Sequence, residues 1–424
     1  FDMTQLNKQI DELANRAIRV LAIATTEDAL GEDALPDSSN WTLVGVVGIR
    51  DEVRPESVTA IAEVKGAGVQ VVMITGDRKE TAVAIAKDAG LLEKDTDVVL
   101  TSDELAKLSD EEIKKMLPNI RVIARALPSD KSRLVRLAQE LDLVAGMTGD
   151  GVNDSPALKK ADVGFAMGGG TEVAKEASDI VILDDNFNSI DRAILYGRTI
   201  FNSIRKFIVF QLTINVSAVL ISFICPLIGI DNPLSVIQIL WVNLVMDTLA
   251  ALAFGGEPAL SRFMHEKPKR RTEQMSQIIT GAGWTFILSL ALLVLGSFDA
   301  DPNVPGVSFL ESWGFLRQNT IEGETHMFLH TAYFAFFIFI AVFNAFNART
   351  DRANLFDNLG KNKGFLTVFG IIAVVQILMT YLGGAILSGY GLNAAEWLMV
   401  LVMAISIIPV DLIRKGIAKA VSNK

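Results

Sequence analysis

Two aspartates, Asp150 and Asp154, stand four residues apart on a glycine-hinged turn. The turn lies in residues 147–162, which read MTGDGVNDSPALKKAD, and it follows the apolar run 143–147. Such a run predicts a strand, and paired carboxylates at the carboxyl end of a strand bind a hard cation such as Mg²⁺ through oxygen. A phosphoryl group can share that cation. The segment therefore predicts a site for phosphate chemistry.

Two further elements could serve the same chemistry. Thr75 follows the apolar run 69–74, where its hydroxyl and the backbone N–H groups of residues 75–77 could hold a phosphoryl oxygen. Lys131 opens a predicted helix and could neutralise charge on a transferring phosphoryl group. Each alone has a plainer interpretation, an ordinary turn or a solvated surface lysine. The aspartate segment is more specific, because a Mg²⁺ site accounts for both acids and for Asn153.

The residues around these positions predict an α/β fold. Short apolar runs expected to be strands lie at 69–74, 98–100, 122–124 and 143–145, with helical spacing at 55–67 and 79–89. Near-continuous apolar strands that alternate with helices indicate a doubly wound parallel sheet covered on both faces. Ahead of them, we expect a helix at 6–17 and strands at 18–23 and 41–48.

From about residue 189 the chain becomes strongly apolar. Six stretches reach the roughly 20 residues that a membrane span needs; they lie near 205–226, 234–254, 276–297, 327–346, 365–387 and 394–412. Basic segments at 262–271, 349–363 and 414–424 alternate with the acidic segment 298–325. By the positive-inside rule, the α/β part and the basic loops should face the cytoplasm. We therefore predict a six-helix transmembrane bundle joined to an α/β domain.

The composition agrees with this division. The 424 residues are 50% hydrophobic but 21% charged, with a mean hydropathy of +0.36, so a soluble part and a membrane part should coexist. The formal net charge of −10 argues against a nucleic-acid partner. The single cysteine, Cys225, cannot form an internal disulfide. The first residues show no signal peptide and no start methionine, so we expect a fragment of a longer protein.

One acid lies deep inside a predicted span. Asp247 would be costly in the bilayer, which makes it a functional candidate. Asn243 precedes it by four residues, so we expect the two side chains to share a helix face. Asn215, on the preceding span, could approach across the short connection. Carboxylate and amide oxygens suit a hard cation such as Ca²⁺, although Asn residues also form plain interhelical hydrogen bonds in membranes.

The order of a threonine, a lysine and an acidic pair matches the haloacid-dehalogenase superfamily. The fuller wording of residues 73–77, 147–159 and 182–187 resembles the calcium-pump subfamily of P-type ATPases, over essentially the whole chain. The resemblance implies that Asp150 ligates Mg²⁺, that Asn153 and Asp154 shape this site, and that Thr75 and Lys131 contact the phosphoryl group. It further implies that four residues lie near ATP: Arg19, Gly76, Asp77 and Arg125.

The resemblance also implies three domains and a missing part. Residues 1–49 would be the end of a nucleotide-binding domain, residues 50–188 most of a phosphorylation domain, and residues 189–424 the transmembrane domain. Asp51 and Arg54 would sit at the hinge between the first two. The phosphate-accepting aspartate of the family's DKTGT motif is absent, as are the actuator domain and the first four membrane helices. We therefore expect this C-terminal half to be inactive without the N-terminal half.

Residues 211–218, 241–248 and 342–349 are similar to the plasma-membrane class of calcium pumps. Two-site pumps place a glutamate where Ala218 stands and another acid in the span 327–346, which has none here. The resemblance thus predicts a monomeric, multi-pass pump of a plasma or inner membrane that exports one Ca²⁺ per cycle. Alternatives are a pump for Mn²⁺, Na⁺/K⁺ or H⁺, a membrane-anchored phosphatase of the same superfamily, or a non-catalytic membrane subunit.

Overall fold

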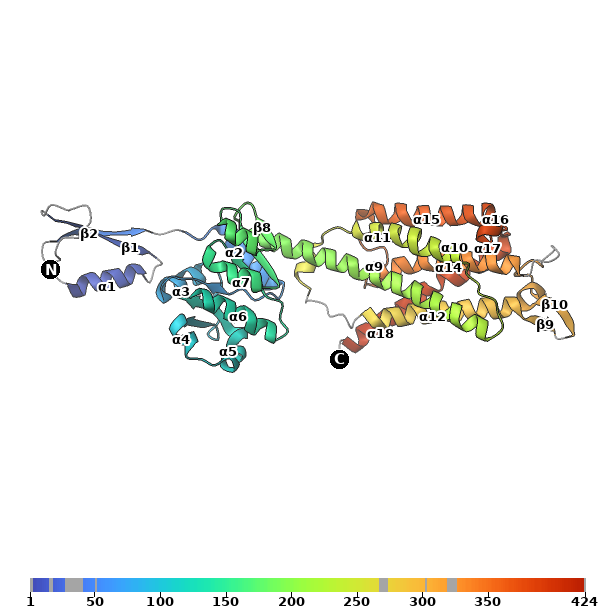
Figure 1. The fold of residues 1–424 in the computed structure, drawn as a ribbon, viewed down its shortest axis with the longest axis horizontal. Coiled ribbons are helices and arrows are strands. Elements are labelled where there is room, and N and C mark those ends of the chain that lie inside the picture. Colours follow the sequence, from blue (N-terminus) through green and yellow to red (C-terminus); the bar gives the residue numbers. More distant parts are fainter. Residues whose placement is uncertain are drawn as a thin grey trace. The chain divides into compact units, whose positions relative to one another are not determined.

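The computed structural model describes residues 3–14, 18–26, 41–49, 52–266, 274–301, 303–318 and 326–422. The chain forms two compact units. The first comprises residues 1–195 with 261–267, and the second comprises residues 196–260 with 268–424. Figure 1 shows that the first unit carries the two parallel sheets and their helices, whereas the second carries the long helices and the short strands β9 and β10.

The first elements of the chain form a helix and a two-stranded ribbon. Helix α1 (Met3–Ala14) precedes β1 (Arg19–Thr25) and β2 (Thr42–Ile49). The two strands pair in antiparallel fashion, and their register shifts between Ile23 and Ala24. The predicted helix and both predicted strands are therefore present.

A first parallel sheet carries the Thr75 segment at its edge. Its strand order is β3 (Met73–Ile74), β5 (Ile120–Ala124), β4 (Val98–Thr101). The helices around it are α2 (Pro55–Gly66), α3 (Lys79–Asp88), α4 (Ser102–Ala106), α5 (Asp110–Met116), η2 (Leu117–Asn119) and α6 (Pro128–Glu140). Strand β5 is covered on both faces, because Val122 packs in the cluster with α2 and α3 and Ile123 packs in the cluster with α5 and α6. This is the doubly wound arrangement that the apolar strands predicted.

A second parallel sheet carries the aspartate segment. Its strand order is β6 (Gly146–Gly149), β7 (Val163–Met167), β8 (Ile180–Ile182). Between these strands lie η3 (Val152–Asp154), α7 (Ser155–Lys160) and α8 (Glu172–Ala177). The strand expected at 143–145 begins at Gly146 instead. The single sheet that we expected is divided, because no strand in the described part of the chain pairs with both β3 and β6.

The second unit contains the membrane-type helices. Among the residues that the structure describes, six helical segments are long and apolar enough to span a bilayer, which agrees with the predicted number. They are α9 (Phe187–Leu227), which begins in the first unit, α10–η4–α11 (Val236–Leu240, Trp241–Met246, Asp247–Gly255), α12 (Met275–Ser297), α14 (Met327–Arg349), α15 (Lys363–Leu382) and α17–α18 (Ala394–Ile405, Ile407–Ser422). Shorter elements connect them: η5 (Ser261–Met264), β9 (Asp299–Asp301), β10 (Val304–Ser308), α13 (Phe309–Ser312), η7 (Leu359–Lys361) and α16 (Gly384–Leu387).

Helix α14 forms the centre of this bundle (Figure 1). It packs against α12, α15, α17 and α18. In its apolar 18-residue stretch 83% is buried, against 28–39% in the corresponding stretches of the other spans. Small residues on α12 permit close packing on two sides: a Cβ on Gly296 would lie 3.1 Å from Leu329 Cγ on α14, and a Cβ on Gly281 would lie 2.9 Å from Thr213 Cγ2 on α9. Close approach at small residues is a common basis of helix association in membranes. The hydrophobic effect does not drive association there, because lipid tails are as apolar as a neighbouring helix.

Candidate functional site: two phosphate-type loops and a buried membrane carboxylate

The loop after β3 is held by its own threonine. Thr75 Oγ1 donates to Asp77 Oδ2 over 2.9 Å and accepts from the Asp77 backbone N–H over 3.1 Å. The Arg125 N–H, in the loop after β5, donates to the Asp77 carbonyl over 2.9 Å. Gly76 and Asp77 are exposed, whereas Thr75 is half-buried. The two loops at the carboxyl end of this sheet are therefore one bonded unit with a solvent-facing rim.

Arg125 adopts an unfavourable backbone conformation. Its φ of +50° lies in the left-handed region, which a residue with a side chain adopts at a cost of about 1 to 3 kcal/mol. The flanking N–H groups are both used, since Arg125 donates to Asp77 and Ala126 donates to the Thr75 carbonyl over 2.9 Å. Arg125, which is exposed, is thus held by its backbone beside Gly76 and Asp77.

An ion pair joins the two sheets' loops. Lys131 Nζ, in the first turn of α6, contacts Asp154 Oδ1 at the end of η3. The two side chains are 17% and 9% exposed. Asp154 Oδ2 also accepts from the backbone N–H groups of Asp150 (3.3 Å) and Gly151 (3.4 Å). Asp154 therefore shapes the turn that carries Asp150, and Lys131 is bound to the same turn.

The loop around Asp150 is closely packed from two sides. A Cβ on Gly170 would lie 2.8 Å from the Asp150 carbonyl oxygen, and the Thr171 N–H donates to that same oxygen over 2.8 Å. A Cβ on Gly149 would lie 2.7 Å from Asp154 Cγ. Our sequence reasoning missed the contribution of residues 168–171, although the run of three glycines before Thr171 was a signal for close backbone approach.

These residues fit a Mg²⁺ ion shared with phosphate. In the described part of the chain, no hydrogen bond or ion pair engages the exposed Asp150 carboxylate, whereas Asp154 is occupied by Lys131. The described residues contain no group of three or more His, Cys, Asp or Glu side chains placed to hold a metal. Mg²⁺ commonly takes one or two carboxylates and completes its shell with water and phosphate oxygens. The Asp150 carboxylate at the exposed edge of its loop fits this mode of coordination.

The predicted phosphate-site residues are only partly brought together. Lys131, Asp150 and Asp154 form one cluster, and Thr75, Asp77 and Arg125 form another. Among the described residues, no hydrogen bond joins Thr75 to Lys131 or Asp150, and none engages the side chain of Asn153, which is exposed. A ligand or a further strand would be needed to connect the two clusters.

Three other predicted positions lie at or near the limits of the described segments. Arg19 begins β1, where its backbone pairs with Ile49. Asp51 lies outside the described residues. Arg54 precedes α2, and its Nη1 donates to the Asp185 carbonyl over 3.2 Å.

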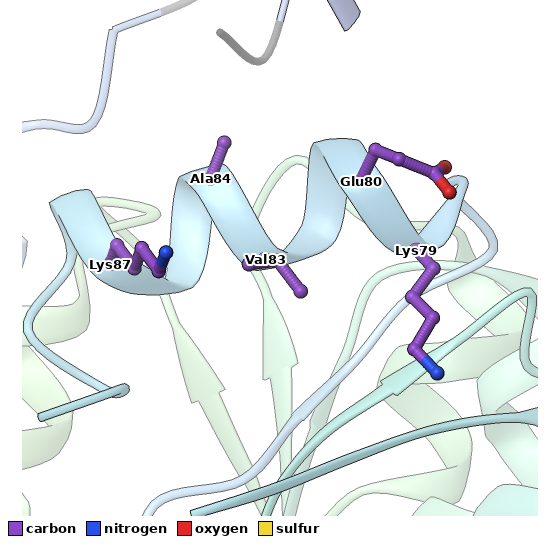
Figure 2. Close-up of a pocket in the computed structure, with 5 residues that line it drawn as sticks. All are labelled: Lys79, Glu80, Val83, Ala84 and Lys87. Atoms are coloured by element: carbon purple, nitrogen blue, oxygen red, sulfur yellow. The ribbon is translucent and has the colours of Figure 1, made fainter. Parts of the chain in front are cut away.

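The hollow drawn in Figure 2 is lined by no residue of either cluster. It measures about 420 Å³ and is lined by Lys79, Glu80, Val83, Ala84 and Lys87, all from α3. The labelled side chains point to different sides of that one helix (Figure 2), and Lys79 is already paired with Glu104 over 3.0 Å. Residues of a single exposed helix do not enclose a ligand, so we assign no function to this hollow.

In the membrane unit, Asp247 is buried and nearly unpartnered. Its exposed fraction is 3%, and it is the first residue of α11. Gln211 Nε2, on α9, donates to Asp247 Oδ2 over 3.2 Å. Asp247 Oδ1 is buried without a hydrogen-bond partner. A buried acceptor of this kind calls for an ion or water as its partner, which fits a cation site.

The backbone before Asp247 departs from the regular α-helix. Residues 241–246 form a π-helix, η4, which has i→i+5 hydrogen bonds in place of the α-helical pattern. A π turn is slightly longer than four residues and an α turn slightly shorter, so four residues still complete about one turn. Asn243 is exposed while Asp247 is buried, and a shared helix face stays a prediction. Single π turns are frequent at functional sites.

Gln211 is the site residue that our sequence reasoning overlooked. It stands one helical turn before Asn215 on α9, and Asn215 is half-buried on the same stretch of helix. The signal was available: a second amide four residues from the first, inside a membrane span, lies on the same face.

The comparisons with known proteins agree with this arrangement. Residues 231–417 match the family described as cation transporting ATPase, C-terminus, and residues 6–162 and 133–194 match families described as haloacid dehalogenase-like hydrolase. The chain is similar to putative calcium-transporting ATPase 13, plasma membrane-type, of Arabidopsis thaliana, with 37% identity over 98% of this chain and 40% of that protein.

Two further relatives show the same pattern. Probable calcium-transporting ATPase 8, plasma membrane-type, of Oryza sativa subsp. japonica is 38% identical over 92% of this chain and 38% of its own length. Calcium-transporting ATPase 2 of Schizosaccharomyces pombe is 37% identical over 89% of this chain and 28% of its own. The chain thus spans well under half the length of these relatives. The chain is therefore an integral membrane protein that joins a haloacid dehalogenase-like hydrolase region, residues 6–194, to a C-terminal domain of the cation-transporting ATPases, residues 231–417.

Proposed function

We propose that the protein containing this chain is an ATP-driven pump that exports Ca²⁺ through an aspartyl-phosphate cycle. The observation that carries this proposal concerns two carboxylates, of Asp150 at a phosphate-type loop and of Asp247 buried in a bundle of membrane-type helices, neither of which has an ion-pair partner among the described residues. The names of the relatives support Ca²⁺ as the cargo. Within the chain, residues 1–49 would end a nucleotide-binding domain, 50–188 would form most of the phosphorylation domain, and 189–424 the membrane domain.

In the proposed phosphoryl site, each loop has its own task. Asp150 would hold Mg²⁺, which when bound would neutralise charge on the phosphate. Lys131 would place a second positive charge there, and Asp154 keeps both in position through its ion pair and its two backbone bonds. Thr75 would contact the phosphoryl group through its hydroxyl and Asn153 would support the Mg²⁺ site.

The nucleotide would lie at the rim of the same loops. Gly76 and Asp77 are exposed there and the Arg125 backbone is fixed beside them. Arg19 would approach from the nucleotide-binding domain. The geometry that supports this proposal is the bonded pair of loops at the carboxyl end of the first sheet.

The acceptor of the phosphoryl group must come from outside these residues, because the chain contains no DKTGT motif. We propose that it arrives on a strand supplied by the N-terminal half. Strands β3 and β6 are both edge strands of parallel sheets, and each ends at a predicted phosphate-site loop. Unpaired edges accept a further strand. A parallel strand paired with both edges would complete one sheet and bring its own carboxyl end between the Thr75 and Asp150 loops. This chain alone would then be inactive.

The cargo site would hold one divalent cation. Asp247 contributes one negative charge, and Asn215 and Asn243 could add neutral oxygens. Ala218 and the whole of α14 contribute no carboxylate, so a second Ca²⁺ would lack the charge it needs. Asn243 is exposed in this chain, and we propose that membrane helices of the N-terminal half cover it and complete the site. The α/β domain would face the cytoplasm, in a plasma or inner membrane.

The test uses the complete protein in sealed vesicles, with ATP hydrolysis and ⁴⁵Ca²⁺ uptake measured together. The wild type should hydrolyse ATP only when Ca²⁺ is present and should transport one Ca²⁺ per ATP. Asp150→Asn should lose phosphoenzyme formation. Asp247→Asn should lose Ca²⁺ stimulation but keep Ca²⁺-independent phosphorylation by inorganic phosphate. Asp95→Asn, an exposed acid elsewhere, should change neither.

Two results would contradict the proposal. Stimulation by Mn²⁺, Na⁺, K⁺ or H⁺ but not by Ca²⁺ would assign the pump another cargo. A ratio of two Ca²⁺ per ATP would overturn the single-site reading of Asp247 and Ala218.

A further inference from the structure

Asp247 differs from the other buried acids of the membrane unit in its partner. Glu257 pairs with Lys206 over 3.0 Å, Asp411 pairs with Lys415 over 2.9 Å, and Glu396 pairs with Arg317 over 3.0 Å. Among the described residues, Asp247 forms no ion pair, and its hydrogen bond comes from the neutral amide of Gln211.

A neutral partner has a specific chemical consequence. A buried lysine or arginine would cancel the charge of Asp247 and would occupy the place of the cargo cation. An amide N–H instead donates to the carboxylate without cancelling its charge, because the amide group is neutral. The bond from Gln211 to Oδ2 therefore leaves the full charge available, with Oδ1 free.

The backbone around Asp247 makes such a partner necessary. Asp247 directly follows the π-helix η4, whose geometry departs from the regular α-helix. One rotatable carboxylate beside an irregular turn needs an external group to hold it, since metal and ligand sites depend on supporting residues that orient the ligating group. Gln211 comes from a different helix, α9, which also carries Asn215 one turn later.

We propose that Gln211 is a positioning residue of the cargo site, whose amide holds Asp247 Oδ2 so that Oδ1 is presented to the cation. This inference rests on the proposed function and adds a residue to it. Gln211 acts through Asp247 and is not itself a ligand. It follows that Ca²⁺ affinity should depend more on the combined length of the two side chains, 211 and 247, than on which of them carries the extra methylene.

The experiment moves one methylene group from the side chain at position 211 to the side chain at position 247. In the complete protein, Gln211→Asn shortens one side, Asp247→Glu lengthens the other, and the double variant restores the combined length. The measurement is the Ca²⁺ concentration for half-maximal ATPase activity. Each single substitution should raise it about tenfold, which corresponds to about 1.4 kcal/mol. The double variant should return to within about threefold of the wild type, because the pair regains its span.

Two controls separate positioning from folding. Gln211→Leu should also raise the half-activating Ca²⁺ concentration about tenfold, yet keep Ca²⁺-independent phosphorylation by inorganic phosphate, which reports an intact fold. Gln376→Leu, at a buried glutamine on α15 that contacts Thr380 and not Asp247, should stay within about twofold of the wild type.

The possible results lead to different conclusions. If both Gln211 variants stay within twofold of the wild type, or if the two single effects multiply in the double variant, Gln211 does not position Asp247. Either outcome leaves the pump proposal intact, provided that the wild type is stimulated by Ca²⁺. A wild type without Ca²⁺ stimulation would overturn the proposed function and this inference together.

Discussion

Replacing Lys131 by alanine tests whether its ion pair holds the Asp150 turn in place. The substitution removes the Lys131 ammonium that pairs with Asp154, and Asp154 as a whole residue is only 6% exposed. Breaking a fully buried pair by removing one partner costs about 3 to 5 kcal/mol, because the remaining charge is left uncompensated. Here Asp154 keeps two backbone N–H bonds, both long at 3.3 and 3.4 Å, and the Lys131 side chain is 17% exposed, so water can reach the gap. We therefore expect a local cost of about 2 kcal/mol.

Hydrogen exchange of the whole chain, read by mass spectrometry, measures this cost directly. Amides in β6 and η3 exchange through local opening, whose equilibrium follows the local free energy. A cost of about 2 kcal/mol should speed their exchange about 30-fold. Lys175→Ala is the matched control, because its partner Glu172 has a side chain that is 81% exposed. Such a surface pair contributes at most about 0.5 kcal/mol, so exchange should change less than about threefold.

The reasoning would be refuted by exchange in β6 and η3 that stays within twofold of the wild type in Lys131→Ala. It would also be refuted if Lys175→Ala accelerated these amides as much. In either case the turn around Asp150 would be held by its backbone contacts to Gly170 and Thr171, and Lys131 would be free to move to a ligand.

Two other predictions concern packing and charge. Gly281→Ala should lower the melting temperature of the detergent-solubilised protein, because the added Cβ would lie 2.9 Å from Thr213 Cγ2. Gly283→Ala is the control: its Cβ would meet nothing within 4 Å, so the melting temperature should stay unchanged or rise slightly. Equal melting temperatures for the two variants would show that α12 can shift. The hydrogen bond from Arg136, followed by that from Arg133, holds the pKa of Asp110 below its ordinary value. Its stabilising effect should be present above the unfolded pKa of about 3.9 and be lost as pH falls through the lower folded pKa. Asp110→Asn should thus be less stable than the wild type in thermal unfolding at about pH 7, with the difference shrinking in strong acid; a difference independent of pH would contradict the assignment.

The sequence by itself determined most of the elements and supplied the candidate site residues. The helical and apolar periodicities located the α/β domain and six spans, because burial in a sheet or a bilayer demands long runs of the right composition. The spacing of acids, glycines and a lysine identified both phosphate-type loops. Asp247 was recognisable because an acid within a span is costly enough to need a function.

Only the tertiary structure decided which of these residues act together. The Lys131–Asp154 ion pair and the Gln211–Asp247 hydrogen bond each join two different elements, separated by 23 and 36 residues, and no periodic pattern encodes such a pairing. The π-helix before Asp247 was not predicted, because a helical pattern of apolar residues does not distinguish i→i+5 from i→i+4 hydrogen bonds. The division of the sheet at β3 and β6 likewise follows from strand pairing, which hydrophobic patterning along one strand does not specify.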